Sequence, residues 1–550
     1  MKENNLVAVL RRRYVSENDH KASDYFGLIR ELLRLKSTEP QVQQAIAEVY
    51  ELIRDEIETT RGKPRNEITF GTSGWRGILG KDVYRASVAA VTEGIVDLYR
   101  LADDNQALHE LLGVSSLDEA RTRGCLVGWD NRFGGEIFGG CVADTLTRYG
   151  FNVYMCGEST TGVLSAALLE LRAAFSINLT PSHNPLDYSG FKYNAADGGP
   201  AASELTAIIT ENARKRVAMT AQQAAPESES TGKQIQTDSL ALWQQKVERS
   251  ASIHRIDYRE LLHRLADHDD IVVVIDSVHG ASRIHLERLL GPAARRLELL
   301  RGEADPTFGG IAPEPSSENM SQVTDRLRAS DKKLKIGAII DPDADRIRFT
   351  DGETEISMNQ FGAMAYDFLH EHRNLRGMVA KTVATSNEFK PVIGTALVCF
   401  EESDGISIIG HTPEKDAYIG LLLALDMVID SGTNLGDIKR EMDKRYGAFY
   451  PDRDGIEVSL KGDALLEALA GLEKYRVGAA VRVGSEEKRI KEVISIDGRK
   501  MIFADDSWLM IRPSGTEPKV RFYVESRDPD GTEDLVTAAR EMLAEIGLLN

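Results

Sequence analysis

The sequence predicts an α/β protein with three consecutive α/β domains containing mixed, mainly parallel sheets, followed by a C-terminal α+β domain with an antiparallel sheet. From about residue 66 to 432, short apolar runs alternate with helical stretches, as in mostly parallel sheets covered by helices. After residue 436, short strands with turn signals between them and two flanking helices predict an antiparallel α+β domain. The length of 550 residues fits three or four domains.

Residues 1–65 are predicted to form an N-terminal helical extension. Apolar residues at helical spacing over 22–60 predict two amphipathic helices that cap the next domain. Residues 66–235 form the first predicted α/β domain. Its apolar runs CLVGW, FNVYMCG and AAFSINL predict strands, and EIFGGCVADTLTRYG and GVLSAALLELR predict the helices between them. The polar stretch 217–235 is predicted to be a linker or surface excursion.

Three further domains are expected after this one. The second α/β domain, 236–350, contains the predicted strands IVVVID and KIGAIID and the predicted helix SRIHLERLL. The third, 351–433, is predicted to contain a helix at 359–372, strands near 377–383 and 396–400, and a helix at 414–430. In the last domain, 434–550, the predicted strands are EVSL, AAVRVG, EVISID, MIFADD, WLMIRPS and VRFYVES.

Composition and charge limit the partners. Lys and Arg number 67 against 86 Asp and Glu, which gives a formal net charge of −19. Such acidity argues against nucleic-acid partners and anionic membranes, since both require clustered cations. It allows a small phosphorylated substrate, provided that arginines and lysines cluster locally.

The chain is also expected to be cytoplasmic. The first 20 residues lack the pattern of a signal peptide. The longest apolar stretches are interrupted by charge well short of the roughly 20 residues of a membrane span. Four widely spaced cysteines without a CxxC motif predict reduced core thiols, namely Cys125, Cys141, Cys156 and Cys399.

A serine in the segment TPSHNPLDYSGFKYN is a candidate phosphoryl carrier. Ser182 lies between two prolines, which fix the backbone and are expected to expose the hydroxyl, and His183 is adjacent. A phosphoserine carries a charge of roughly −2 and needs cations nearby. Lys192 and Arg76 are available for that purpose. Taken alone, the segment is better explained as a Ser-Pro-rich turn.

An acidic segment, DPDADR, directly follows the predicted strand KIGAII. Asp341, Asp343 and Asp345 alternate, so an extended backbone would present all three carboxylates to one side. Three converging hard oxygen anions suit Mg²⁺. A solvated acidic turn is the alternative, but the alternation with Pro and Ala at a strand end favours a metal site. An EF-hand is excluded because its central Gly and final Glu are absent.

Two further segments have the composition of ligand loops. In CFEESDG, Glu401 and Ser403 lie at a strand end, where they can bond the vicinal hydroxyls of a sugar, although an exposed acidic loop is an equal alternative. The segment RPSGTEPKVR has the composition of a phosphate nest and lacks the Walker pattern. Its expected phosphate ligands are Arg512, Ser514, Gly515, Thr516 and Arg521.

Taken together, these motifs resemble the α-D-phosphohexomutase superfamily. The matching segments are FGTSGWRG, TPSHNP with GFKYN, DPDADR, FEESDG with EKD, and RPSGTEP ending in Arg521. They occur in the family's order over residues 70–521, so the resemblance covers nearly all of the chain beyond the N-terminal helices. It implies four domains around a central cleft.

The resemblance also implies a mechanism. Ser182 would be phosphorylated in the resting enzyme, and Mg²⁺ would be held by a phosphoserine oxygen together with Asp341, Asp343 and Asp345. A hexose phosphate would be converted through a 1,6-bisphosphate, glucose 1,6-bisphosphate, which turns over within the cleft. The phosphate of the bound hexose phosphate would bind the RPSGTEP loop, and Glu401 and Ser403 would hold the sugar hydroxyls.

Other residues match positions that the family places near the substrate. Arg76, His183 and Lys192 would surround the reacting hydroxyl, and Lys192 or His183 would assist proton transfer. Substrate contacts are implied for a further set, namely Thr72, Ser73, Arg346, Lys381 and Lys415. A positive cleft inside an acidic protein is expected from Arg76, Lys192, Arg346, Arg512 and Arg521.

One departure affects the third domain. Between VAKTVATS and VCFEESDG the chain has only the residues 387–397, where family members carry another helix and strand, on the order of 20 residues. The first hypothesis is a phosphoglucomutase that also acts on mannose phosphates, as a monomer or small homo-oligomer. The alternatives are a phosphomannomutase and a phosphosugar-binding protein with impaired turnover. An aspartyl-phosphate phosphatase is disfavoured because it would not explain TPSHNP or RPSGTEP.

Overall fold

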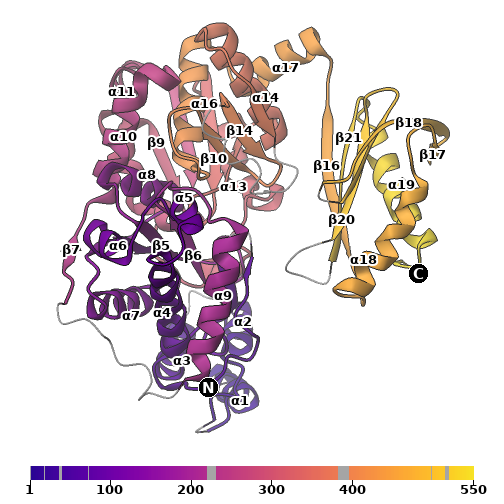
Figure 1. The fold of residues 1–550 in the computed structure, drawn as a ribbon. Helices are drawn as coiled ribbons and strands as arrows, with labels where there is room; N and C mark the ends of the chain where they lie inside the picture. Colours follow the sequence, from indigo (N-terminus) through magenta and orange to yellow (C-terminus); the bar gives the residue numbers. More distant parts are fainter. Residues whose placement is uncertain are drawn as a thin grey trace.

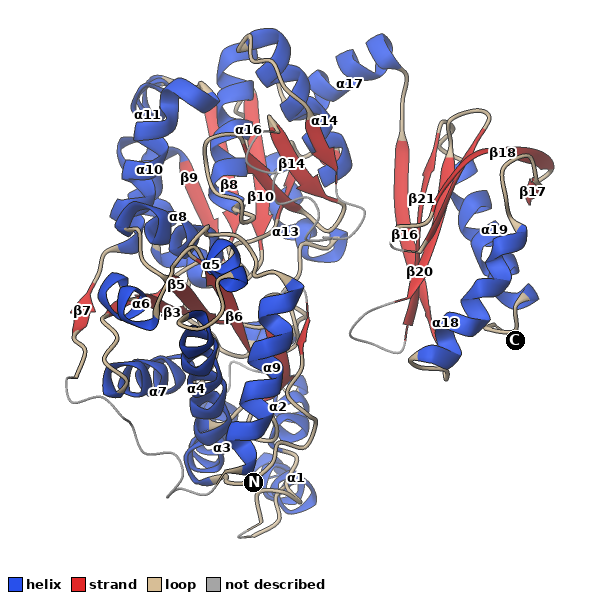
Figure 2. Cartoon of the chain, viewed as in Figure 1, coloured by secondary structure: helices blue, strands red, loops and turns tan. Residues whose placement is uncertain are grey.

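The computed structural model describes residues 2–17, 19–35, 40–71, 74–219, 231–381, 396–496, 498–513 and 519–549. Within them, four sheets follow one another along the chain, of seven, five, three and six strands. The first three are accompanied by helices, and the last is antiparallel, so the predicted fold class is confirmed (Figures 1 and 2).

The N-terminal extension packs onto the first α/β domain. The described part contains α1 (Lys2–Tyr14), α2 (Tyr25–Arg34) and α3 (Pro40–Thr59). The last two are the predicted amphipathic helices, and α1 was not predicted. Ile29, Leu32 and Ile53 are fully buried in the core of the first domain, because their spacing places them on one face of each helix.

The first sheet is mixed. Strands β5, β3, β4 and β7 are parallel, whereas β6, β2 and β1 continue the sheet antiparallel. In pairing order the strands are β1 (Phe70–Gly71), β2 (Gly74–Ile78), β6 (Tyr188–Ala195), β5 (Phe175–Leu179), β3 (Cys125–Trp129), β4 (Val153–Glu158) and β7 (Gln234–Gln236). The end of the predicted linker therefore forms the edge strand β7, while 220–230 lie outside the described residues.

Helices cover this sheet. The helix α4 packs against both α7 and α9, while α8 packs against α10 of the next domain. The helices of the first domain are α4 (Arg85–Ala102), α5 (Ala107–Leu112), α6 (Leu117–Arg123), α7 (Gly135–Arg148), α8 (Thr161–Leu171) and α9 (Ser203–Ala218).

The second sheet has a parallel centre, in which β10 and β9 flank β8, and an antiparallel edge. In order its strands are β12 (Glu355–Ile356), β11 (Ile347–Thr350), β10 (Leu334–Ile340), β8 (Ile271–Asp276) and β9 (Leu297–Leu300). Its α-helices are α10 (Ser239–His254), α11 (Tyr258–Asp267), α12 (Leu286–Leu290) and α13 (Ser317–Ala329). The predicted helix SRIHLERLL is instead a 3₁₀ turn, Ala281–Ile284, followed by the short α12, which Gly291 ends.

The third sheet shares one hydrophobic core with the second. Strand β13 (Val379–Lys381) pairs parallel with β14 (Val398–Glu401), which pairs antiparallel with β15 (Gly405–Ile408). The helices are α14 (Met358–Asp367), continued by a π turn at Phe368–His372, α16 (Ala417–Ser431) and α17 (Leu435–Tyr446). Most of the short segment 387–397 lies outside the described residues.

The C-terminal domain has its own core and stands beside the α/β domains in Figure 1. In order its strands are β16 (Tyr450–Glu457), β21 (Lys519–Ser526), β20 (Trp508–Pro513), β19 (Arg499–Phe503), β18 (Glu486–Ile494) and β17 (Ala480–Val483). Its α-helices are α18 (Asp463–Ala470) and α19 (Gly531–Glu545). The first strand, β16, lies N-terminal to the predicted strand EVSL. It was not recognised because it is a largely exposed edge strand whose charged residues interrupt the apolar alternation.

No single helix among the described residues is both long and apolar enough to cross a membrane; α16 and α17 meet those criteria only as a pair bent by 78°.

Candidate active site

The loop that carries Ser182 follows β5 and is held rigidly by a buried arginine. The Arg132 guanidinium donates to the carbonyl oxygens of Ser182 and Pro185, both at 2.7 Å, and to that of Asn184. The Ser182 N–H donates to Thr180 Oγ1 at 2.9 Å. These bonds hold Ser182 at a φ of +56°, a strained conformation for a serine, of a kind that clusters at functional sites.

The Ser182 hydroxyl is buried, which corrects the expectation that the prolines expose it. Its Oγ donates to Asp341 Oδ2 at 2.7 Å and lies 3.4 Å from both Asp345 Oδ1 and His183 Nδ1. The serine of the first domain and the acidic loop of the second, 159 residues apart in sequence, therefore meet at one point.

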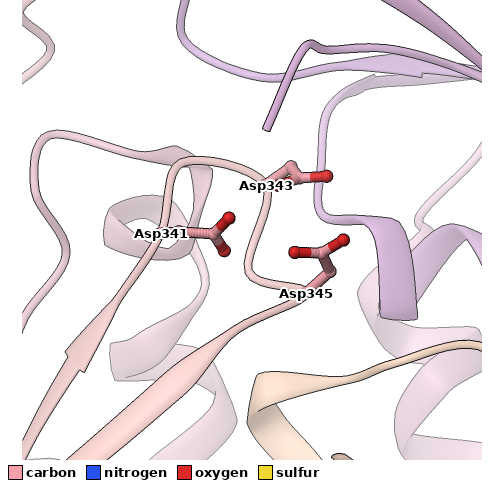
Figure 3. Close-up of side chains that lie close together, drawn as sticks. All are labelled: Asp341, Asp343 and Asp345. Carbon is pink, nitrogen blue, oxygen red and sulfur yellow. The ribbon is translucent and has the colours of Figure 1, made fainter. Parts of the chain in front are cut away.

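The three aspartates converge as predicted, but through a turn and not along an extended strand (Figure 3). Ala344 has a φ of +51°, which reverses the loop after β10 and brings the side chains together. All three are buried, and each contributes an oxygen to a group whose members lie within 4.8 Å of one another. Asp343 Oδ1 has no hydrogen-bond partner among the described residues.

The electrostatics of the triad fit a hard divalent cation. Burial raises the pKa of Asp341 well above its ordinary value, and the nearby charges of Asp345 and Asp343 raise it further. Burial alone would raise the pKa of Asp345 too, but Lys192, Lys415 and Arg346 outweigh burial and hold that pKa well below its usual range. Full ionisation of the triad therefore requires an additional positive charge, and oxygen donors are those that Mg²⁺ prefers.

Two lysines lie against the triad. Lys192 Nζ is 2.5 Å from Asp343 Oδ2 and 2.8 Å from Asp345 Oδ2. Lys415 Nζ is 3.3 Å from Asp345 Oδ2 and 3.2 Å from Glu401 Oε1. Burial alone would lower the pKa of Lys192, but the carboxylates of Asp343 and Asp345 outweigh it and raise that pKa above its ordinary value. Lys192 is therefore a firmly charged ammonium in this arrangement.

His183 lies beside Ser182, and the charge of Arg76 acts on His183. Arg76, on β2, donates to Asn184 Oδ1 at 2.7 Å, so a loop residue orients the guanidinium. Burial, followed by the charges of Arg346 and Arg76, holds the pKa of His183 well below its ordinary value. At neutral pH this imidazole is therefore uncharged.

The loop of Glu401 and Ser403 is joined to the loop that carries the three aspartates. Arg346 forms a backbone bridge with Gly405, and Ile347 N donates to Asp404 O at 2.8 Å. Burial alone would raise the pKa of Glu401, but Lys415 and Arg346 outweigh it and lower that pKa. Ser403 donates a side-chain hydrogen bond to Glu401, which also favours the carboxylate.

The candidate phosphate loop is only partly described. Arg512 on β20 and Arg521 on β21 are direct cross-strand partners at its base. The charge of Arg512 acts on Glu402, so this end of the C-terminal domain interacts electrostatically with the loop that carries Glu401. Several predicted positions lie outside the described residues, namely Thr72, Ser73, Ser514, Gly515 and Thr516, and of Lys381 only the backbone, in β13, is described.

Three functional candidates were missed in the sequence: Arg132, Thr161 and Asn178. Arg132 follows strand β3, Asn178 lies near the end of strand β5, and Thr161 begins helix α8. Polar residues at such positions often form ligand sites in α/β sheets. Asn178 is the cross-strand partner of Lys192, so a correct pairing of β5 with β6 would have revealed it.

Three models of one family match the chain. Phosphoglucomutase/phosphomannomutase alpha/beta/alpha domain I matches residues 67–218, domain II matches 256–354 and the C-terminal domain matches 461–542. Together the matches cover more than half of the sequence. The residues between 354 and 461 lie outside these three matches.

Individual relatives are named for different sugars. The "Phosphoglucosamine/phosphogalactosamine mutase" of Sulfurisphaera tokodaii is 22% identical, covering 86% of this chain and 98% of the relative. The "Phosphoglucomutase" of Staphylococcus haemolyticus is 24% identical, covering 83% and 90%. The crystal structure of a "putative phosphomannomutase" from Thermus thermophilus has a TM-score of 0.67 and 22% identity, covering 87% of this chain and 99% of that chain.

The chain therefore belongs to the phosphoglucomutase/phosphomannomutase family of the α-D-phosphohexomutase superfamily. Membership implies an isomerase of the mutase type. Because these relatives are named for four different sugars, the family defines the class of reaction and not the particular hexose.

Proposed function

We propose that the protein is a phosphoglucomutase that interconverts glucose 1-phosphate and glucose 6-phosphate, with mannose phosphates as secondary substrates. The observation that carries this proposal is the 2.7 Å contact between Ser182 Oγ and Asp341, within the buried triad. The name of the Staphylococcus haemolyticus relative supports glucose as the sugar.

Ser182 would carry the phosphoryl group in the resting enzyme. A free hydroxyl of the bound sugar phosphate attacks that phosphorus, the bond to Ser182 Oγ breaks, and the proton of the attacking hydroxyl is transferred to the protein. The product is glucose 1,6-bisphosphate. After the bisphosphate turns over, Ser182 Oγ attacks its other phosphate and the sugar oxygen takes up the proton.

The triad and a phosphoserine oxygen would hold Mg²⁺. When bound, this ion withdraws charge from the phosphoryl group. We assign the proton transfer to His183, because its imidazole is neutral and its Nδ1 lies 3.4 Å from Ser182 Oγ. Lys192 is assigned to charge stabilisation, because its raised pKa keeps it protonated and leaves no free lone pair to accept a proton.

Glu401 and Ser403 are assigned to the sugar hydroxyls, and Arg512 and Arg521 to the distal phosphate. Glu401 is buried and ionised beside Lys415, so it offers a fixed acceptor to a sugar hydroxyl in either orientation of the bisphosphate. The remaining substrate assignments, Arg346, Lys381 and the residues of the two partly described loops, stay predictions.

The test is conversion of glucose 1-phosphate, with Mg²⁺ and a trace of glucose 1,6-bisphosphate, measured by coupling glucose 6-phosphate to its dehydrogenase. Ser182→Ala is expected to abolish turnover, and Ser485→Ala, at an exposed hairpin serine, is expected to retain it. Intact-mass spectrometry is expected to find one phosphoryl group on wild type and none on Ser182→Ala. A wild-type protein as inert as Ser182→Ala would favour a phosphosugar-binding protein instead.

Glucosamine phosphate is the second candidate substrate, favoured by the name of the Sulfurisphaera tokodaii relative. Initial rates with the 1-phosphates of glucose, mannose and glucosamine decide between them. A higher kcat/KM for glucosamine 1-phosphate would replace glucose in the proposal while leaving the role of Ser182 intact.

A further inference from the structure

We propose that the Thr161 hydroxyl, oriented by Asn178, is a positioning group that fixes the Asp343 carboxylate so that only its Oδ1 is left for a divalent cation. The inference rests on the proposed function in one respect, namely that the aspartate triad holds a cation. Neither Thr161 nor Asn178 needs to touch the substrate for this role.

Thr161 attaches the acidic loop of the second domain to a helix of the first. It is the first residue of α8, and its backbone N–H donates to Asp343 O at 2.8 Å. Its Oγ1 donates to Asp343 Oδ2 at 2.5 Å. One residue thus fixes both the backbone and the side chain of Asp343, across 182 positions of sequence.

The direction of these hydrogen bonds follows from the chemistry of the partners. A threonine hydroxyl has one proton, and an ionised carboxylate only accepts, so the proton must point to Asp343. Asn178 Nδ2, 2.9 Å from Thr161 Oγ1, must then be the donor to that oxygen. Lys192 Nζ, 3.4 Å away, is a donor as well. With both acceptor positions of Thr161 filled, the hydroxyl cannot rotate away without breaking the chain of bonds.

The consequence is an asymmetric carboxylate. Asp343 Oδ2 accepts from Thr161 and from Lys192, whereas the buried Oδ1 has no partner among the described residues. Thr161 and Lys192 differ in one physical respect. The ammonium repels a divalent cation bound nearby, while the neutral hydroxyl orients the ligand without opposing its charge. Partners of this kind in the outer shell of a metal site strongly affect its affinity.

The test measures Mn²⁺ binding directly, by electron paramagnetic resonance of free Mn²⁺ titrated with metal-free full-length protein, so that no turnover is required. Thr161→Val keeps the shape and removes the hydroxyl, and we expect its Mn²⁺ affinity to fall about 10–100-fold. Thr161→Ser is the matched control and is expected to remain close to wild type. Asn178→Leu leaves the hydroxyl unoriented and is expected to give a smaller loss.

Thermal unfolding in EDTA measures the stability of the metal-free protein, which a purely structural role of Thr161 would change. Unchanged Mn²⁺ affinity in Thr161→Val would overturn the proposal, whatever its melting temperature. If Thr161→Val does not fold, Asn178→Leu decides, and an affinity equal to wild type would again overturn it. In turnover, saturating Mg²⁺ is expected to restore most of kcat in Thr161→Val; a lower kcat with an unchanged Mg²⁺ requirement counts against the proposal.

The outcome is distinguishable from failure of the proposed function. A wild-type protein that binds Mn²⁺ in a Thr161-dependent manner but converts no sugar phosphate would reject the mutase assignment and keep this inference. If the wild-type protein is an active mutase but Thr161→Val binds Mn²⁺ normally, the mutase assignment is kept and this inference is rejected.

Discussion

Replacing Arg132 by methionine removes the group that holds the serine loop while keeping much of the side-chain volume. In the folded protein its guanidinium donates to the carbonyl oxygens of Ser182, Asn184 and Pro185 and lies 3.3 Å from Asp130. It also stacks over the Phe308 ring, 4.7 Å from its centroid. Asp130, Ser182 and Phe308 are buried, so no water replaces the guanidinium there when it is lost. Asn184 is half-buried and Pro185 is exposed, so their carbonyl oxygens can bond water instead.

The magnitude follows from what is left unpaired. Hydrogen bonds to charged groups contribute about 1.5–3 kcal/mol each, but adding several would overcount, since Asp130 and the carbonyls relax together. Removing one partner of a buried ion pair destabilises by about 3–5 kcal/mol. Burial raises the pKa of Asp130 to about 6 even beside Arg132, so its protonation relieves part of the penalty. We therefore expect Arg132→Met to destabilise the first domain by about 3 kcal/mol, the lower end of that range.

The assay combines urea unfolding with the phosphoryl content of Ser182. Arg132→Lys keeps the charge but lacks the planar fork, so it is expected to fall between methionine and wild type. Arg12→Met, at an exposed position on α1, is the matched control and should change neither quantity. A loss smaller than about 1 kcal/mol in Arg132→Met, the size expected of a surface pair, would refute the argument that this residue holds the loop.

Three further perturbations have expected outcomes. Asp343→Asn should abolish turnover with the melting temperature in EDTA little changed, because Lys192 keeps its 2.8 Å pair with Asp345. Asp104→Asn at an exposed turn should be silent, and retained turnover in Asp343→Asn would remove Asp343 from the metal site. Arg30→Ala, which breaks the 2.5 Å pair with Asp187, should speed amide hydrogen exchange over residues 182–188, and unchanged exchange would mean that α2 does not restrain the loop. Burial lowers the pKa of His254 to about 4, so as the pH falls below 6.5 the unfolded chain takes up the proton before the folded protein does. The free energy of unfolding should therefore decrease by about 3 kcal/mol between pH 6.5 and pH 4. The same pH dependence in His254→Gln would contradict this assignment.

The fold could be predicted from the sequence where the pattern is local. Buried strands such as β8 and β10 are apolar except for Asp276 at the end of β8 and Lys335 near the start of β10, and α16 is apolar over most of its length. The edge strand β16 was misplaced because its exposed face is charged and its apolar alternation is therefore lost. The N-terminal α1 has few buried residues, which gives it only a weak periodic signal.

The site could be predicted where a motif is contiguous, as for Ser182 and the aspartates. What could not be predicted depends on contacts between distant segments. The burial of the Ser182 hydroxyl and the charge of Lys192 both result from the second domain's acidic loop closing over β5 and β6. Thr161 resembles an ordinary residue at a helix start until α8 is placed against Asp343. No spacing rule relates residues so far apart.

The packing of the N-terminal extension has a consequence for synthesis of the chain. Helices α2 and α3 leave the ribosome before any residue of the first sheet. Besides packing on each other, they bury their apolar faces in the core of that domain, to which Phe308 and Ile311 of the second domain also contribute. Until the first domain has been translated, Ile29, Leu32 and Ile53 lack most of the core that buries them. The nascent chain must therefore carry an exposed apolar surface during translation of the first domain, a period in which aggregation competes with folding and chaperones are most useful.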